Sequence, residues 1–287
     1  YYEGGGAATA PVVPVLDQLA SSALGAWCIS RRLKADYEGN LVRLRRDSDN
    51  AAEDFGFDSN GDLDGAAVTS WAGGAGLFVV TVYDQIGSNH HTQATAGSQP
   101  PYAASAIGGN PGFTGDGSFT TPVLGGTSAA AFNGLATGGC AVLLVCRTGA
   151  SVSGAAWVRD QYTGGRGIGL GISKMQFASN GSVGNAVYQA DPTISTNTTL
   201  VETVNYDGTL GAGAVTWRRN GGAVTVNDTP GSGSLANDSA GLNSLWGAGF
   251  FQGSLVGNHC ELIIFASPLS SGDLATLNDN AATYYGA

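Results

Sequence analysis

The residues best suited to metal binding or nucleophilic catalysis include three histidines, and their spacing argues against both roles. His90 and His91 are adjacent, so on a strand their side chains would face opposite ways and would not chelate one metal. The third, His259, is far away in sequence, and a three-histidine site is the alternative in which the fold brings it back. The chain has no Ser-His-Asp set, phosphate loop, HExxH motif or G-x-S-x-G elbow. The sequence therefore predicts no metal and no cofactor.

The four cysteines lie in apolar, strand-like segments without the spacing of metal ligands. Cys140 and Cys146 fall in one such run, on the same face but too far apart to bond directly. We therefore expect buried free thiols. A long-range pair, such as Cys28 with Cys260, is the alternative.

Two polar segments are candidates for ion binding or for loop structure. Residues 58–64, DSNGDLD, superficially resemble a calcium loop, but the Gly is not sixth and no Glu is twelfth. Asn60-Gly61 instead predicts a hairpin turn. Further on, Asp84 and Asn89 can bond nearby backbone amides, which predicts a structured loop.

Composition and charge limit the class of protein. The chain has 287 residues, 43% of them hydrophobic, and 46 are glycine, which is typical of a turn-rich, all-β domain with a sizeable core. A net charge of −10 argues against a nucleic-acid partner. No stretch approaches the roughly 20 apolar residues of a membrane span, so no membrane insertion is expected.

The basic residues are concentrated, because half of the 12 fall between Arg31 and Arg46. Residues 26–33 and 41–46 alternate in polarity, so we expect a strand pair with the basic side chains on its solvent face, opposite the acids of 47–64. An anion or acidic-glycan site is the alternative. Asp64 can cap a short helix.

Apolar runs of strand length define the rest of the chain. Residues 76–83, GLFVVTVY, predict a central strand buried on both faces. Residues 215–219 and 223–226 flank Asn220-Gly221-Gly222, a strong hairpin signal. Further strands are expected at 141–146, 156–158, 167–172, 175–177 and 199–206. This spacing predicts a two-sheet sandwich, with residues 1–14 as a flexible tether and 15–287 as one domain.

The stretch from Cys260 to Tyr285 predicts a buried strand, a turn and a closing helix. Ser270 stands three residues before Asp273, which is the spacing of a capping box. The hydrophobic staple would join Leu269 and Leu274. A stripe at helical spacing then faces a core: Leu274, Leu277, Ala281 and Tyr284.

Two sets of segments resemble known families. The order VNYDGT, VTWRRNGGAV and FFQGSLVGNHCELIIFASPLSSGDLATL resembles the later half of laminin-G-like, concanavalin-type jelly rolls. The segments LVRLRRDSDN and VYDQIGSNHHTQAT resemble the N-terminal half of the arabinofuranosidase B catalytic domain, glycoside hydrolase family 54. Sequences with a DFGFDSNGDLD-like insert between these two segments also occur in bacteriophage virion proteins. The resemblance implies an all-β, concanavalin-like jelly-roll β-sandwich with a short C-terminal helix.

The resemblance also implies where catalytic carboxylates should stand. A retaining glycosidase needs two of them about 5 Å apart. The family's nucleophile, a Glu after Met in a mid-chain strand, corresponds to Gln176, and an amide cannot form a glycosyl ester. The family's acid/base Asp falls in a stretch that here carries Phe250 and Phe251 and no acid. The resemblance thus predicts degenerate catalytic positions, and Asp160, Asp191 and Glu202 could serve only by a new geometry.

These observations favour a non-enzymatic phage virion surface module, on a tail fibre, a tail tip or a capsid, that binds host glycans. The candidate sugar contacts are Trp157, Trp217 and Trp246, although each is also a natural core residue. Expected partners are other virion subunits, through the N-terminal tether, and a host cell-surface glycan. A homo-oligomer at the virion surface, and so outside the cell, is expected. The alternatives are an arabinofuranosidase-like hydrolase and a purely structural capsid decoration protein.

Overall fold

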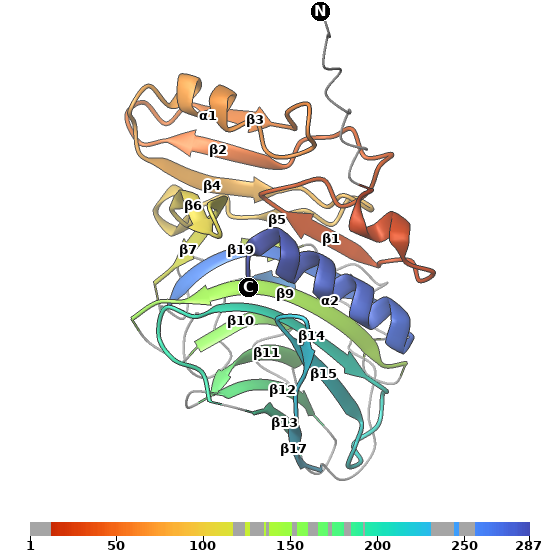
Figure 1. The fold of residues 1–287 in the computed structure, drawn as a ribbon. Helices are drawn as coiled ribbons and strands as arrows, with labels where there is room; N and C mark the ends of the chain where they lie inside the picture. The colour runs from red at the N-terminus through yellow and green to blue at the C-terminus, as the bar shows by residue number, and fades with distance from the viewer. Residues whose placement is uncertain are drawn as a thin grey trace, which may run out of the picture.

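Two antiparallel β-sheets and a C-terminal helix make up the computed structural model of the chain (Figure 1). The fold is the predicted concanavalin-like jelly-roll β-sandwich. The structure describes residues 13–116, 124–126, 135, 138–150, 154–159, 166–171, 174–180, 185–191, 193–230, 244–246 and 256–287. The expected tether at 1–14 therefore lies almost wholly outside the described residues. No helix among these residues is long and apolar enough to cross a membrane.

The first sheet has eight described strands, in the order β16-β15-β14-β9-β19-β7-β6, with β1 also paired to β19. Their bounds are β1 (Gly25–Cys28), β6 (Tyr102–Ile107), β7 (Asn110–Gly115), β9 (Cys140–Thr148), β14 (Thr199–Tyr206), β15 (Val215–Arg219), β16 (Gly222–Ala223) and β19 (Gly257–Phe265).

The second sheet has eleven described strands, in the order β17-β13-β12-β11-β10-β18-β8-β5-β4-β2-β3. Their bounds are β2 (Val42–Arg46), β3 (Ala52–Phe55), β4 (Leu77–Val82), β5 (His91–Thr92), β8 (Leu124–Gly126), β10 (Gly154–Arg159), β11 (Arg166–Gly171), β12 (Lys174–Asn180), β13 (Asn185–Ala190), β17 (Val226–Thr229) and β18 (Ser244–Trp246). Two short 3-10 turns, at Val15–Gln18 and Ala96–Ser98, lie between strands or before them.

Two central strands of the eight-stranded sheet are buried on both faces. Along β9, Val142 and Leu144 face the core between the sheets, whereas Leu143 and Val145 face a second core beneath the C-terminal helix. Strand β19 divides its side chains in the same way. Because successive residues of a strand point to opposite faces, a strand between two cores needs apolar side chains on both faces, as β9 has from Cys140 to Cys146.

Both helices begin at the caps that the sequence predicted. Asp64 accepts a hydrogen bond from the Ala67 amide at the start of α1 (Gly65–Ala72). Ser270 accepts one from the Asp273 amide at the start of α2 (Ser271–Tyr285). The buried stripe of α2 ends on Tyr285 rather than on Tyr284, which is only half-buried.

Helix α2 is fastened to the eight-stranded sheet by Asn278, which is fully buried. Its Nδ2 donates to the Val201 carbonyl at 3.0 Å and to Thr203 Oγ1 at 2.8 Å. Its Oδ1 accepts from the amide of Gly221, in the β15–β16 turn. One side chain thus satisfies groups on a central strand and on a hairpin.

Three expectations about strands were wrong. Strand β1 does not pair with β2; it pairs with β19, in the other sheet. All four residues of β1 are buried, so the strand has no alternation of buried and exposed residues from which its partner could be predicted. Strand β4 is not buried on both faces, since Leu77 and Phe78 stay partly exposed. The Asn220-Gly221 turn forms, with φ of 49° and 82°, but Val226 beyond it starts β17 in the other sheet.

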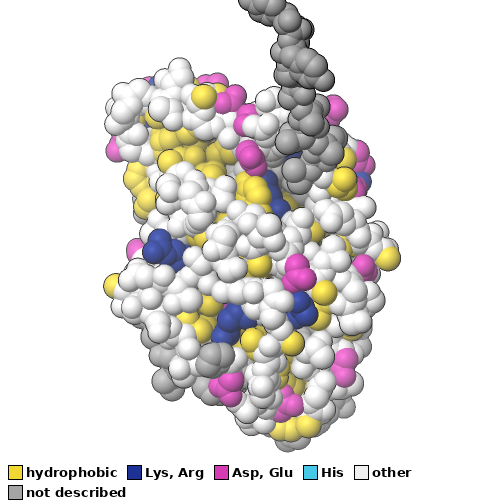
Figure 2. Space-filling view, in the orientation of Figure 1, with side chains coloured by type: hydrophobic (Ala, Val, Ile, Leu, Met, Phe, Trp, Pro, Cys, Tyr) yellow, Lys and Arg dark blue, Asp and Glu magenta, His cyan; other side chains and the backbone are white. Residues whose placement is uncertain are grey.

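The basic cluster on β2 lies on the solvent side and is paired with nearby acids. Arg43 Nη1 is 2.7 Å from Asp54 Oδ2, and Arg46 Nη2 is 2.7 Å from Asp49 Oδ2. Figure 2 shows Lys and Arg side chains in small, separate groups on the face of the molecule that it draws. These pairs favour the solvated-face interpretation of the cluster over the anion site.

One basic residue of this region, Arg31, is instead buried. Its Nε and Nη2 donate to the two carboxylate oxygens of Glu261 on β19, at 2.9 and 3.0 Å. Tyr285 Oη donates to the same carboxylate at 3.1 Å, and Cys28 Sγ is 3.5 Å away from it. All four cysteines are buried and free, as expected, so the alternative Cys28–Cys260 pair does not form.

Aromatic rings fill the core between the sheets around His91. This imidazole lies edge-on to Trp27, with centroids 4.4 Å apart, and 6.1 Å from Trp246. His90, its neighbour, faces the other way and accepts a hydrogen bond from the Asp84 amide. Burial, together with the charge of His90, lowers the pKa of His91 to about 3.

Asn278→Ala should lower the free energy of unfolding by about 2–3 kcal/mol, because it removes the hydrogen bonds to the Val201 carbonyl, to Thr203 Oγ1 and from the Gly221 amide. Urea denaturation measures this change. The matched control is Asp279→Ala, which removes the exposed ion pair to Arg218 and should cost about 0.5 kcal/mol or less. Equal losses in the two variants would contradict the fastening role of Asn278.

The low pKa of His91 should make the protein less stable in acid. Below the ordinary value of 6.5 the unfolded chain takes up a proton that the folded state refuses until about pH 3. The free energy of unfolding should therefore fall with pH across that window, by at most about 5 kcal/mol. His91→Leu should flatten this slope in denaturation curves recorded from pH about 7 to about 4. An unchanged slope would show that other groups dominate.

Candidate functional site

The two fully buried glutamates hold the core together and are out of reach of a substrate. Glu202 on β14 accepts from Trp217 Nε1 and from Arg219 Nε, each at 2.5 Å. Burial raises the pKa of Glu202, and Arg219 opposes that rise. Glu261 is enclosed by Arg31 and Tyr285. Among the carboxylates named above as alternatives to the family's catalytic pair, Glu202 therefore stabilises the core. Asp160 lies outside the described residues.

The loop after β4 is held by Asp84. Its Oδ1 accepts from the amides of Ala26 and Ile86, and its Oδ2 accepts from the Asn89 amide. The Asn89 carbonyl in turn accepts from Trp27 Nε1 at 2.7 Å. Asp84 and Asn89 thus join the loop to β1, and their hydrogen bonds stabilise the fold.

The register of the second sheet places Gln176 on one defined face. Gln176 stands opposite Gly169 on β11 and opposite Gln189 on β13, and Gln189 stands opposite Asn227 on β17. Residues directly opposite in antiparallel strands share a face. A row of positions therefore crosses four neighbouring strands, and we call it the amide row: Gly169, Gln176, Gln189 and Asn227.

The opposite face of these strands is the core of the sandwich. Tyr188 and Ala190 are fully buried in it, and the Tyr188 ring lies 6.3 Å from that of Tyr206 on the other sheet. Since Gln189 lies between them in sequence, the amide row lies on the outward face. Asn227 is exposed, which agrees with this placement.

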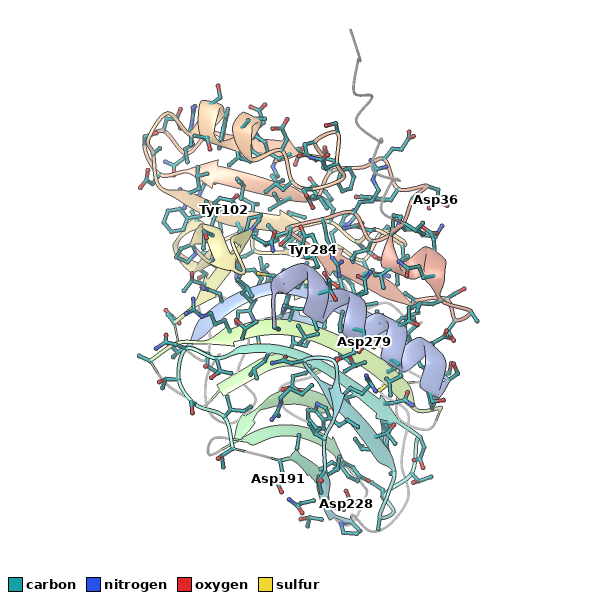
Figure 3. The ribbon with its side chains drawn as sticks, viewed as in Figure 1. Asp36, Tyr102, Asp191, Asp228, Asp279 and Tyr284 are labelled. Atoms are coloured by element: carbon teal, nitrogen blue, oxygen red, sulfur yellow. The ribbon has the colours of Figure 1, made fainter. Side chains whose placement is uncertain are left out.

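Asp191 is the described carboxylate beside the amide row. Its amide donates to the Thr225 carbonyl at 2.9 Å, which continues the β13–β17 pairing, and its Oδ2 accepts from Asn227 Nδ2. Asp228, also labelled in Figure 3, stands opposite Tyr188 and so belongs to the inward-facing positions. Its Oδ2 accepts from the Gly213 amide at 2.6 Å. The two aspartates therefore cannot form a catalytic pair on one face.

The tryptophans predicted to contact sugar belong to the sandwich. Trp217 is 2% exposed and Trp246 is 0% exposed, so neither offers a ring face to a ligand. Trp157 stands opposite Trp246 in the register, at an inward position. Phe250 and Phe251 lie outside the described residues.

The residue types at the positions on this outward face allow only a few kinds of chemical step. Amides donate and accept hydrogen bonds without charge, and Asp191 adds one carboxylate that could take a proton from water. Sequence reasoning found Gln176 and Asp191 but missed Gln189 and Asn227. The signal for Asn227 was the alternation of apolar and polar residues from Val224 through Thr225 and Val226 to Asn227. No group of three or more His, Cys, Asp or Glu among the described residues is arranged to hold a metal.

Comparison with known proteins points to one family of glycosidases. A family model for the catalytic domain of alpha-L-arabinofuranosidase B matches residues 18–116. Comparison with curated proteins finds no match.

Three of the matching solved structures each cover 94% of this chain. A GH54 arabinofuranosidase soaked with a cyclic sulfate inhibitor is 15% identical, with a TM-score of 0.64. An arabinofuranosidase complexed with arabinofuranosyl-alpha-1,2-xylobiose is 16% identical, with a TM-score of 0.61. A Glu-to-Gln mutant of a GH54 arabinofuranosidase, soaked with 4-nitrophenyl arabinofuranoside, is 14% identical, with a TM-score of 0.64. Each match covers 94% of this chain but only 64% of the other.

These matches overturn the expectation of a non-enzymatic virion module. Both the family model and the structural matches lead to arabinofuranosidases, and neither supports a phage, a tail fibre or an adhesin. They favour the alternative, a hydrolase-type fold. The expected location and oligomeric state stay predictions. The chain shares its β-sandwich with GH54 arabinofuranosidases, and its residues 18–116 match the model of the arabinofuranosidase B catalytic domain.

Proposed function

We propose that this chain is an arabinofuranosidase-like glycoside hydrolase acting at the outward face of β11, β12, β13 and β17. The observation that carries the proposal is the fold match over 94% of the chain to three arabinofuranosidase structures. The family model over residues 18–116 supports it independently. Because the chain spans 64% of the length of those structures, the activity is proposed for this domain alone.

The site is proposed to centre on Gln176 and Asp191. The resemblance puts Gln176 at the family's nucleophile position, and the register puts it on the face opposite the core, two positions diagonally from Asp191. Diagonal neighbours in a sheet lie about 7–8 Å apart. Two carboxylates at such a separation leave room for a water between them in inverting glycosidases, whereas retaining enzymes need about 5 Å.

The side-chain amide of Gln176 limits which mechanism can be proposed. It cannot form a glycosyl ester, so a covalent intermediate at this residue is not available. Asp191 instead takes a proton from water as the water oxygen bonds to the anomeric carbon. The bond from that carbon to the leaving-group oxygen breaks, and this oxygen departs with the electron pair and takes up a proton from solvent water. Asn227 holds the Asp191 carboxylate in place, and its role is to position that group.

The test is release of 4-nitrophenolate from 4-nitrophenyl α-L-arabinofuranoside, whose leaving group departs without an acid. Asp191→Asn should lower kcat/KM by roughly a hundredfold or more, because general base catalysis contributes at least that much. The matched control is Asp228→Asn, on the inward-facing side of the neighbouring strand, which should retain the wild-type rate. No release by the wild type, or equal rates in the two variants, would sink the proposal.

A second test adds a carboxylate at the amide position. Gln176→Glu should raise the rate of hydrolysis of an alkyl arabinofuranoside, whose leaving group needs an acid, by roughly tenfold or more, since a second carboxyl group at this separation can act as the general acid. Proton NMR of the first product should show inversion at the anomeric carbon for the wild type and for Gln176→Glu. A slower variant with an unaltered fold would mean that position 176 is not at the reacting centre.

A further inference from the structure

Two Asn-Gly pairs, Asn60-Gly61 and Asn220-Gly221, lie wholly within the described residues, out of four in the chain. Both form hairpin turns, closed by the pairings of Phe57 with Leu63 and of Arg219 with Gly222. An asparagine followed by glycine can react with its own backbone, because glycine has no Cβ to shield its amide nitrogen. The same dipeptide thus occurs in two surroundings that can be compared directly.

The Asn220-Gly221 turn is fastened through both of the groups that would react. Asn220 Oδ1 accepts from the Val201 amide at 2.8 Å, and its Nδ2 donates to the Thr199 carbonyl at 3.1 Å. The Gly221 amide, which would be the nucleophile, donates to Asn278 Oδ1 at 2.7 Å. These partners belong to β14 and α2, so the pair can react only when the hairpin separates from both elements.

The Asn60-Gly61 turn holds the same two groups by short-range contacts. The Asn60 side chain is exposed, and its Nδ2 donates within the turn, to Asp58 Oδ2 at 3.4 Å. The Gly61 amide donates to the Asp58 carbonyl at 3.2 Å, the long end of the usual range. Freeing the two reacting groups therefore breaks only hydrogen bonds inside the turn, which costs less than separating a hairpin from two packed elements.

We infer that Asn60 is a site of spontaneous deamidation in the folded protein, whereas Asn220 is protected. The Gly61 nitrogen loses its proton and bonds to Asn60 Cγ, and the bond from Cγ to Nδ2 breaks as ammonia leaves with that proton. Water then adds across one C–N bond of the cyclic imide, and a proton returns to the Gly61 nitrogen. Opening at one carbonyl gives aspartate, and opening at the other gives isoaspartate, in which the backbone runs through the side chain.

The product alters a turn that contacts the rest of the fold. The Gly61 carbonyl accepts from the Arg32 amide at 2.7 Å, and Asp62, the next residue, accepts from Tyr284 Oη at 2.7 Å. The new carboxylate lies beside that of Asp58 and adds one negative charge to the net charge of −10. Isoaspartate also lengthens the backbone just before Gly61. Deamidation therefore loosens the contact of this turn with Arg32.

The experiment follows the wild-type chain, folded, in mildly alkaline buffer well below its unfolding temperature. Peptide mapping by mass spectrometry measures each Asn-Gly pair separately, and an isoaspartate-specific methyltransferase detects isoaspartate. Deamidation at Asn60 should be at least about tenfold faster than at Asn220, which must first break its hydrogen bonds to other elements. In urea the two rates should agree within about threefold, since glycine follows both. An unmodified Asn60, or equal rates in the folded protein, would overturn the inference.

The protection of Asn220 is tested by Asn278→Ala, which frees the Gly221 amide. This variant should raise the rate at Asn220 roughly threefold to tenfold and leave the rate at Asn60 unchanged. Circular dichroism checks that the variant is folded. An unchanged rate at Asn220 in a folded variant, or an equal rise at both sites, would contradict protection by α2.

The loosening of the turn is tested by Asn60→Asp, which carries the acid product, against the neutral control Asn60→Ser. Hydrogen exchange of the Arg32 amide, which donates to the Gly61 carbonyl, should be roughly threefold faster or more in Asn60→Asp than in Asn60→Ser. Equal exchange in the two variants would show that the added charge leaves the turn in place and would overturn the loosening.

Discussion

The buried ion pair between Arg31 and Glu261 is the interaction on which the layers depend. It joins the segment after β1 to β19, residues 230 apart in sequence, and Tyr285 of α2 completes it. The Arg31 side chain is 10% exposed and that of Glu261 is not exposed at all. Removing one partner of such a pair costs about 3–5 kcal/mol, because the other charge is left buried. Arg31 Nη1 also donates to Asn280 Oδ1 at 2.7 Å, so the guanidinium has partners on two elements.

Two strands of the eight-stranded sheet also make contacts on both of their faces. Strands β9 and β19 serve two cores at once, which lets one sheet carry both the sandwich and the helix layer. In the other sheet, Tyr188 and Ala190 of β13 face the core between the sheets. The register of β12, β13 and β17 puts the positions of the amide row, and Asp191 beside them, on the face opposite that core.

Local features of this fold could be predicted from sequence because they depend on neighbouring residues. The Ser270 cap, the Asp64 cap and the Asn220-Gly221 turn are each specified within a few positions. The partner of β1 could not be predicted, since a strand buried throughout has no alternation to indicate its partner. Asn278 was missed for the same reason, because an Asn on a helix shows nothing of the carbonyls it meets across the sheet.

The candidate site likewise contains residues that the sequence indicated and residues that only the structure identified. The resemblance identified position 176, and composition drew attention to Asp191. Gln189 and Asn227 became visible only through register, which depends on how three strands align and is not written in any one of them. Trp217 and Trp246 are buried, and a large aromatic ring suits a core as well as a sugar, so the sequence alone could not distinguish the two roles.

The distance in sequence between Arg31 and Glu261 also bears on how the chain reaches this state. Contacts between residues so far apart close late, because the loop between them costs entropy before any contact repays it. During synthesis Arg31 must stay hydrated until β19 has emerged. Before then β1 can form the bridge from Trp27 to Asp84, but the side chains that pack against β19 and α2 lack those partners. Productive folding would favour conditions that keep the nascent chain from associating with others.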